Sequence, residues 1–306
     1  MIGLGIGELT ATTAAACWAC SSIIYGRTRL GAGTINFIKN LLGTIFVLLH
    51  LTVLWMLFGE SFLQFSAKAW GYLVLSGLIG IALGDTCYFR SLQILGPRRS
   101  LIVATTSPIF GALLGWLLLE ETISFWPLAG IIVTILGIGV VVMDKQARLE
   151  SPGHYPGAEW AGVGFGLIAA ACQATGGAVS KLGMEECTPL EATFVRLLAA
   201  TVFGIALFGS MGKLGTITSA LRQKKNLAML VPAAMLGTWL GIWCSQIGFK
   251  YTSIAVATML MSTGPLFAIP LVRFFDGHRI SARAIWGTMV ALLGIGTMLF
   301  GESVFQ

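Results

Sequence analysis

Four ionisable side chains lie inside long apolar runs of this chain: Lys39, Asp85, Arg90 and Arg196. A charge placed there costs of order 3 kcal/mol on membrane-insertion scales, so it marks a solute pathway or a buried ion pair. Lys39 and Arg196 recur at matching places in FIKNLL (37–42) and FVRLL (194–198). Both lie about one helical turn from the start of their runs. They could be two cations beside a central cavity, or long side chains that reach the lipid headgroups. Arg90 is expected to reach the membrane surface.

Asp85 differs from the other three because a carboxylate on a single methylene group cannot reach far. It lies between Gly84 and Thr86, just past the middle of its run. Two explanations stay open: an ion pair with Lys39 or Arg90, or a carboxyl group kept protonated by burial. The second explanation would let the group bind a proton on one side of a membrane and release it on the other. Asp85 is therefore the candidate for proton coupling.

Other polar and aromatic side chains within the runs are candidates for lining a pocket. Hydroxyls just before a proline have a second explanation, since they can satisfy backbone groups that the proline leaves unpaired. Together with the two cations, the candidate substrate-binding residues are Trp18, Lys39, Tyr88, Thr105, Ser107, Gln173, Arg196, Trp243, Gln246 and Ser262.

The remaining chemistry of the sequence argues against an enzyme. The three histidines are scattered, and the six cysteines lie mostly in apolar runs without metal-ligand spacing, so neither a metal nor a cofactor is expected. No P-loop, dinucleotide fingerprint or nucleophile–base pair is present. The net charge of +6 comes from Lys and Arg spread over short loops, which does not predict nucleic-acid binding.

Composition places the chain in a membrane. With 56% apolar and 10% charged residues, it could not fold as a water-soluble domain without a large exposed apolar surface. Runs long enough to cross the bilayer, about 20 residues each, predict ten transmembrane helices. They are Leu9–Tyr25, Ile35–Leu57, Trp70–Ser91, Leu101–Leu119, Trp126–Met143, Trp160–Ser180, Ala192–Phe208, Leu227–Phe249, Ile254–Phe274 and Ala284–Phe300.

The same unit occurs twice. Residues 80–139 and 237–296 align without a gap at a shift of 157 and are identical at 16 of 60 positions, where about 5 are expected by chance. The matches include small and ring-constrained residues that pack helices closely or interrupt them. We assign hinge or packing roles to Gly80, Gly84, Pro108, Gly237, Gly241 and Pro265.

A polar break divides the runs into five and five, which predicts a first repeat at 1–148, a linker at 149–159 and a second repeat at 160–306. Because five is odd, the second repeat begins on the opposite side of the membrane, so the two repeats are inverted. Lys and Arg gather in the loops that follow odd-numbered runs. The positive-inside rule then places both termini outside the cytoplasm of a multi-pass cell-membrane protein.

The run ALGDTCYFRSLQILGPRRSLIVATTSPIFGALLGWLLLEE, residues 82–121, resembles the third and fourth helices of an EamA-type repeat of the drug/metabolite transporter superfamily. The duplicated five-helix unit and the LGIG near the end of each half are also similar to that family, so the resemblance covers essentially the whole chain. It implies a secondary transporter of amino acids, metabolites or drugs, with some members exchanging solute for protons. Many ten-span relatives have cytoplasmic termini, whereas the charges here indicate the reverse.

The sequence therefore predicts alternating access around a midplane cavity, with export or exchange of a small organic solute and protons as a second partner if transport is coupled. The bilayer is the other partner, and a monomer is expected, with an oligomer left open. Two alternatives remain: a non-transporting sensor or assembly subunit, and a membrane-embedded enzyme.

Overall fold

The computed structural model describes residues 5–59, 62–120, 125–142, 158–268, 271 and 281–304. Within these residues the chain is helical and forms no β-strand. Six helices there are long and apolar enough to cross a membrane, fewer than the ten expected from hydropathy. One apolar helix of the second half, Ile254–Ala268, is shorter than the others.

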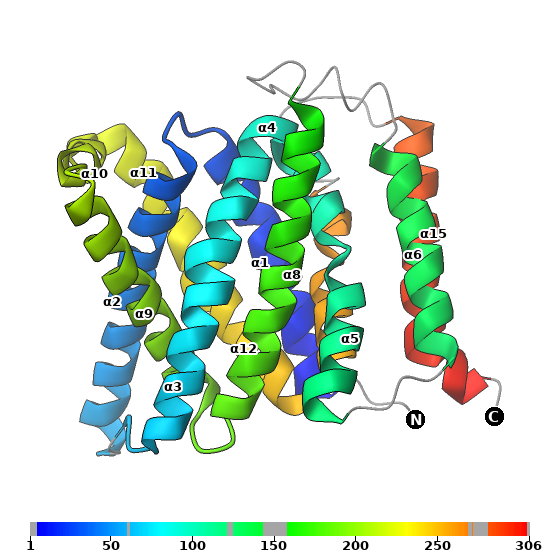
Figure 1. The fold of residues 1–306 in the computed structure, drawn as a ribbon, viewed down its shortest axis with the longest axis horizontal. Helices are drawn as coiled ribbons and strands as arrows, with labels where there is room; N and C mark the ends of the chain where they lie inside the picture. Colours follow the sequence, from blue (N-terminus) through cyan, green and yellow to red (C-terminus); the bar gives the residue numbers. More distant parts are fainter. Residues whose placement is uncertain are drawn as a thin grey trace.

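The helices form an upright bundle, and its longest members run side by side from one end to the other (Figure 1). The first half contains α1 (Ile6–Gly26), α2 (Ala32–Phe58), α3 (Ala67–Ser76), η1 (Gly77–Gly84), α4 (Asp85–Ala104), α5 (Ser107–Leu119) and α6 (Phe125–Val142). The second half contains α8 (Glu159–Gly183), α9 (Pro189–Ser210), α10 (Leu214–Arg222), α11 (Lys224–Ala233), η2 (Ala234–Leu240), α12 (Gly241–Tyr251), α13 (Ile254–Met261) and α15 (Ala282–Val304). Most of the expected linker, 149–157, lies outside the described residues.

Side-chain caps fix several helix ends. Thr188 forms a capping box with Glu191 at the start of α9, and Ser66 accepts a hydrogen bond from the amide of Ala69 at the start of α3. Gly96 has φ of 79°, a conformation that favours glycine, and with Pro97 it breaks the helical path within α4. This break lies between the predicted runs Trp70–Ser91 and Leu101–Leu119.

The bundle is apolar on the outside and partly polar inside. Leu48, Trp55, Phe58 and Trp160 are all exposed. Buried positions instead include many hydroxyl, amide and charged side chains. This distribution is the reverse of that in a water-soluble protein, and it suits a molecule surrounded by lipid and enclosing a polar interior.

Prolines mark matching breaks in the two halves. Thr105 and Thr106 leave the helix, which resumes in α5 with Pro108 in its first turn. Ser262 and Thr263 leave the helix in the same way just before Pro265. A proline in a first turn loses no helical hydrogen bond. The expected kinks are therefore present as short interruptions.

Two π-helical segments, η1 and η2, were not expected from the sequence. They fall at matching places, around Gly80 and Gly84 in the first half and around Gly237 in the second. A π-helix is wider than an α-helix and leaves backbone carbonyls free for other donors. Each segment packs against the other half: η1 contacts α8 and α9, and η2 contacts α1 and α2.

Equivalent helices of the two halves pack in reciprocal pairs. Helix α1 packs along η2, α12 and α13, whereas α8 packs along η1, α4 and α5. Helices α2 and α9 pack on each other, as do α6 and α15. Two hydrogen bonds join residues separated by the repeat shift of 157. Thr44 bonds to Thr201 at 3.0 Å, and Thr134 donates to the carbonyl of Ala291 at 3.3 Å.

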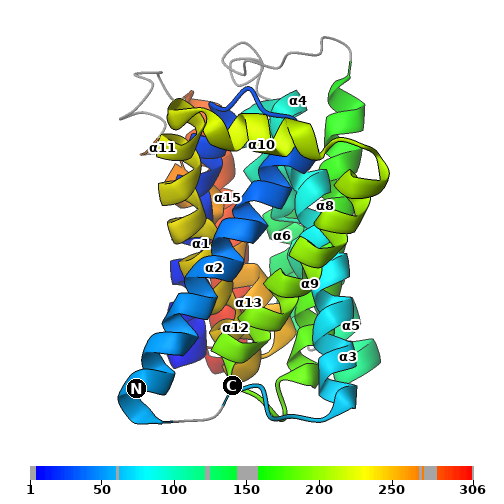
Figure 2. The ribbon, with the colours of Figure 1, turned by 90° about the vertical axis from the view of Figure 1, so that its left-hand side faces the viewer.

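The two halves also begin at opposite ends of the bundle. Helix α1 starts at the lower end of the bundle as drawn, and α8 starts at the upper end (Figure 1). Between α9 and α11, the short helix α10 lies across the bundle's end rather than along its axis (Figure 2). Hydropathy did not predict this helix, because its nine residues are too few to cross a membrane. Ile217 and Ala220 are its buried residues.

Candidate functional site

A cavity of about 130 Å³ lies between the two halves. This volume is comparable to that of engineered cavities that hold benzene. Its wall is mostly apolar, with a limited set of polar groups, which is typical of small-molecule sites. The polar and aromatic lining residues come from both halves: Trp18, Ser21, Ser22, Tyr25, Lys39, Asp85, Tyr88, Phe89, Ser107, Gln173, Arg196, Thr238, Ser245, Thr258 and Ser262.

An ion pair forms one wall of the cavity. The Lys39 Nζ lies 2.7 Å from the Asp85 Oδ2, and the two side chains are 5% and 26% exposed. Lys39 is also 5.9 Å from the centroid of the Phe89 ring. Of the two explanations for Asp85, the structure contains the ion pair, and the partner is Lys39. The carboxylate still faces the cavity and is accessible to a solute or a proton.

The ion pair continues into a chain of amides that reaches η1. Lys39 donates to Asn40 at 2.7 Å, and Asn40 donates to Asn36 at 3.0 Å. The Asn36 Nδ2 then donates to the carbonyls of Ile81 and Ala82, both at 3.0 Å. Asn36 thereby satisfies carbonyls at the π-helical segment, where the i→i−4 ladder is interrupted. The charge on Lys39 is thus linked to the segment that precedes Asp85.

Arg196 lies in the equivalent place on α9, lines the cavity and is only 2% exposed. Its guanidinium forms no hydrogen bond or ion pair with any residue that the structure describes, and its Nε is among the buried atoms without a partner. Lys39 is 4% exposed. The expectation that these two cations could reach the headgroups is wrong, because α2 and α9 begin earlier than hydropathy suggested and both side chains are buried.

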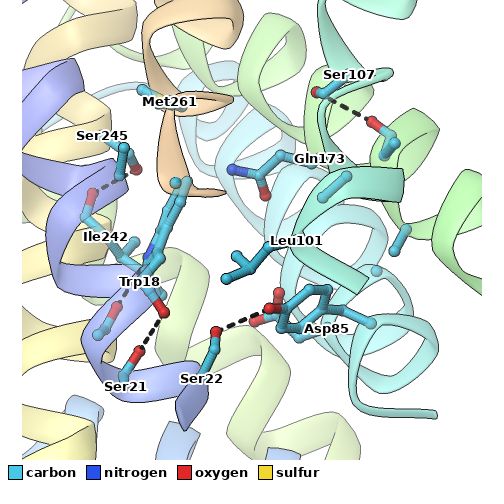
Figure 3. A pocket seen from close by; sticks show the side chains of 18 of the residues that line it. Trp18, Ser21, Ser22, Asp85, Leu101, Ser107, Gln173, Ile242, Ser245 and Met261 are labelled. Carbon is cyan, nitrogen blue, oxygen red and sulfur yellow. Dashed lines mark hydrogen bonds between the residues drawn. The ribbon is translucent and has the colours of Figure 1, made fainter. Parts of the chain in front are cut away.

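Trp18, Ser22 and Tyr88 line the side of the cavity nearest α1. The Trp18 indole donates to the carbonyl of Gly237 in η2 at 3.0 Å, and the Ser22 hydroxyl bonds to that of Tyr88 at 2.8 Å. Figure 3 shows Trp18 beside Ile242, with the Ser22 bond reaching across toward the helix of Asp85. These bonds occupy the polar atoms of the Trp18 and Tyr88 rings. The faces of the two rings remain free to contact a solute in the cavity.

Gln173 projects into the cavity from α8 (Figure 3), and its amide makes no hydrogen bond with a described residue. Ser107 and Ser262 also line the cavity, but their hydroxyls donate to the carbonyls of Ala170 and Thr258. Of these three predicted residues, Gln173 has the greatest free hydrogen-bonding capacity toward a solute.

Three predicted residues do not line the cavity. Thr105 donates to the carbonyl of Ile102, so its hydroxyl satisfies the backbone before Pro108. Gln246 is fully buried and receives a hydrogen bond from Ser180. Trp243 packs edge-on against His50, with ring centroids 5.0 Å apart. Trp243 and Gln246 lie on sides of α12 that face neighbouring helices, and the sequence could not distinguish these sides.

The predicted hinge residues divide in the same way. Gly84, Gly237 and Pro265 line the cavity, whereas Gly80, Gly241 and Pro108 lie outside its lining. Close approach explains the glycines. A methyl group on Gly80 would lie 2.9 Å from the Arg196 Nη2, and one on Gly241 would lie 2.9 Å from the Trp18 Nε1. The sequence indicated close packing at these glycines, and it did not indicate their partners.

Other residues of the site were missed in the sequence. Asn36 and Asn40 are one helical turn apart in an apolar run, and that spacing beside Lys39 is the signal that could have identified them.

Arg90, expected at the membrane surface, is half-buried and lies outside the cavity lining. Its guanidinium Nη1 is 3.5 Å from the side-chain oxygen of Gln93. Among the described residues no group of three His, Cys, Asp or Glu side chains could hold a metal.

Comparisons with known proteins agree with this geometry. A model of the EamA-like transporter family matches the chain twice, at residues 5–143 and 160–300. An uncharacterized transporter of Archaeoglobus fulgidus is 24% identical over 294 residues, covering 95% of this chain and 97% of that protein. The uncharacterized transporter YdfC of Bacillus subtilis is 27% identical over 125 residues, which is 41% of this chain and 39% of that protein.

The fold is also found in a crystal structure of another protein, with a TM-score of 0.75 and 16% identity over 98% of this chain and 99% of that one. Identity at that level establishes the shared fold alone. The two family matches cover nearly the whole chain, and the relatives named above are transporters. This chain is therefore a multi-pass membrane transporter that belongs to the EamA-like transporter family of the drug/metabolite transporter superfamily.

Proposed function

We propose that this transporter moves a small organic solute by alternating access, with the cavity between its halves as the binding site. The observation that carries the proposal is the cavity wall, to which both halves contribute charged, amide and aromatic side chains. A site shared in this way can open to either side as the halves move against each other. Export and exchange are the directions that we propose.

The proposed architecture is ten spans in two inverted five-helix repeats, at 1–148 and 160–306. Two hydrogen bonds between residues 157 positions apart support it, because equivalent residues touch only near a symmetry axis. The reciprocal packing of α1 and α8 supports it as well. The close contacts at Gly80 and Gly237 then lie between halves, where small residues allow backbones to slide.

We propose the cell membrane as the location, with both termini outside the cytoplasm and the monomer as the working unit. Lys and Arg in the loops after odd-numbered spans support this orientation. A reporter enzyme fused after Gln306 tests it. Activity of the fusion in the cytoplasm would reverse the assignment, and cross-linking in the membrane tests the monomer.

Solute transport is tested with purified protein in two assays. A thermal-shift screen against a metabolite panel identifies solutes that stabilise the protein, and proteoliposomes preloaded with such a solute report uptake of its labelled form. We expect faster uptake into preloaded vesicles than into empty ones, because an exchanger returns loaded. A protein that binds solutes without any flux in either vesicle would be a sensor.

We further propose Asp85 as the site of proton coupling. Its carboxylate faces the cavity and is held by Lys39 at 2.7 Å, so proton binding would release Lys39 and alter the cavity. Asp85→Asn should abolish proton-driven uptake and spare exchange, and Asp85→Glu should retain part of it. If a folded Asp85→Asn protein takes up solute with a proton gradient as fast as the unmodified protein, the proposed role of Asp85 is contradicted.

A further inference from the structure

We propose that Arg196 binds the carboxylate of the transported solute, and that this solute is a small organic monoanion. The assignment rests on the proposed transport function and names its substrate class. It starts from the state of the guanidinium, which lines the cavity, is 2% exposed and forms no hydrogen bond or ion pair with a described residue. The Asp85 carboxylate acts on it only from beyond ion-pair distance. A buried charge without a partner is costly, so a ligand that supplies one is favoured.

The repeat indicates what is missing. At the shift of 157, Arg196 corresponds to Lys39 and Ile242 corresponds to Asp85. Lys39 has its carboxylate at 2.7 Å, whereas Arg196 faces a cavity whose wall contains Ile242 in the equivalent place. Figure 3 shows Ile242 on the α12 side of the cavity and Asp85 on the α4 side. The second half therefore has the cation of the pair, and the solute would supply the anion.

Backbone packing positions the guanidinium without neutralising it. The Arg196 Nη2 lies against two glycines of different helices. A methyl group would be 2.9 Å from it if added to Gly80 and 3.3 Å if added to Gly176. Glycines leave the room that the group occupies and offer no anion. Such a rigid, planar donor suits the two oxygens of a carboxylate.

The charges of the cavity wall select the net charge of the solute. Among the lining side chains, Lys39 and Asp85 compensate each other and Arg196 contributes one positive charge. A monoanion would make the closed cavity neutral, whereas a zwitterion would leave one charge and a cation would add another. The volume of about 130 Å³ and the rings of Trp18 and Tyr88 suit a compact carboxylate with an apolar body.

Matched pairs of probes separate charge from shape. Purified full-length protein in neutral-lipid nanodiscs would be unfolded thermally with benzoate or benzamide, with lactate or lactamide, and with alanine as a zwitterion. We expect at least one carboxylate to stabilise the protein more than its amide and more than alanine. Equal stabilisation by carboxylate and amide would overturn the assignment, and so would stabilisation by none of the carboxylates.

Variants then locate the binding group. Arg196→Gln should weaken the apparent carboxylate affinity by about tenfold or more, and Arg196→Lys should retain part of it. Ile242→Asp keeps Arg196 and supplies an internal carboxylate, so it should also abolish carboxylate binding in a protein that stays folded. Arg90→Gln removes a guanidinium outside the cavity lining and should bind as the unmodified protein does.

Unchanged carboxylate binding by Arg196→Gln, or by a folded Ile242→Asp protein, would overturn the assignment. Counterflow in proteoliposomes is read separately. Arg196-dependent binding without flux would contradict the transport function and support the anion site. Flux that does not distinguish the carboxylates from their amides would support transport and contradict the anion site.

Discussion

The two halves place the same kind of cation beside one cavity and treat it differently. In the first half Lys39 is held by Asp85 and continues through Asn40 and Asn36 to the π-helical segment. In the second half Arg196 has no such partner. At the shift of 157, Leu197 replaces Asn40 and Thr193 replaces Asn36. In a duplicated scaffold, one half can thus neutralise its own buried cation with a carboxylate. The other half leaves its buried cation without an ion pair.

The largest effect on stability is expected when the first half receives the residue that the second half has opposite its cation, which is isoleucine in place of Asp85. Asp85→Ile leaves the Lys39 ammonium buried without its partner, and losing one member of such a pair costs about 3–5 kcal/mol of folding free energy. The measurement is the unfolding free energy in micelles. The double variant Lys39→Leu/Asp85→Ile should recover most of the loss, and equal losses in the single and double variants would contradict the prediction.

The reverse exchange should have the opposite sign. Ile242→Asp gives Arg196 a carboxylate in the place that Asp85 has in the first half, so it should stabilise the protein by about 1–3 kcal/mol. A rise in the thermal unfolding midpoint is the measurement. Ile242→Asn, which has the same shape as the aspartate without its charge, is the control. A rise of the same size in this control would show that charge compensation is not the cause.

A smaller difference is expected at the amides. Asn36→Leu removes the amide donor to the carbonyls of Ile81 and Ala82, at a cost of about 1–3 kcal/mol, although the Ala82 carbonyl keeps its hydrogen bond from the Thr86 hydroxyl. The equivalent Thr193 only donates to the carbonyl of Pro189 in its own helix, so Thr193→Val should cost less than about 1 kcal/mol. Unfolding free energies of the two variants compare them, and a reversed order would contradict the predicted role of Asn36.

The smallest effect concerns a contact at the bundle's end, between Glu186 and Ser66. Glu186, before α9, accepts hydrogen bonds from the amide and the hydroxyl of Ser66, and these bonds lower its pKa below the ordinary value of 4.5. Because the folded-state pKa is the lower one, this stabilisation is present above pH 4.5 and is lost as pH falls through the folded value.

Thermal unfolding of the protein and of Glu186→Gln between pH 6 and pH 3 measures that contribution. The gap between their midpoints should close as the pH falls. Glu185→Gln, one residue earlier, is the matched control and should show no such convergence. A gap that persists at the lowest pH would mean that the contact with Ser66 does not depend on the charge.

Much of the fold followed from hydropathy and from a few backbone residues. Apolar runs located the long helices, and Pro108 and Pro265 located the matching interruptions. Helix ends were less accurate: α9 begins at Pro189, where its capping box stabilises it, rather than at Ala192. This earlier start places Arg196 deeper in the bundle, so of the two explanations given for this cation, a reach to the headgroups is the wrong one.

The site was partly predictable for a related reason. Trp18, Gln173 and Arg196 line the cavity as expected, whereas Trp243 and Gln246 face neighbouring helices. A helix that is apolar on every side has no hydrophobic stripe to indicate which side faces the interior. Residue type could therefore nominate candidates, and only packing could separate those that face the cavity from those that do not.

By itself, the sequence determined a duplicated, helical membrane protein with cations at matching places of its two halves, because composition and repetition can be read directly along the chain. Tertiary structure decided that the helices widen at Gly77–Gly84 and Ala234–Leu240, and that Lys39 meets Asp85. It also decided that Arg196 has no carboxylate within ion-pair distance among the described residues. These outcomes depend on which atoms of different helices come within a few ångströms, and no spacing along one helix specifies that distance.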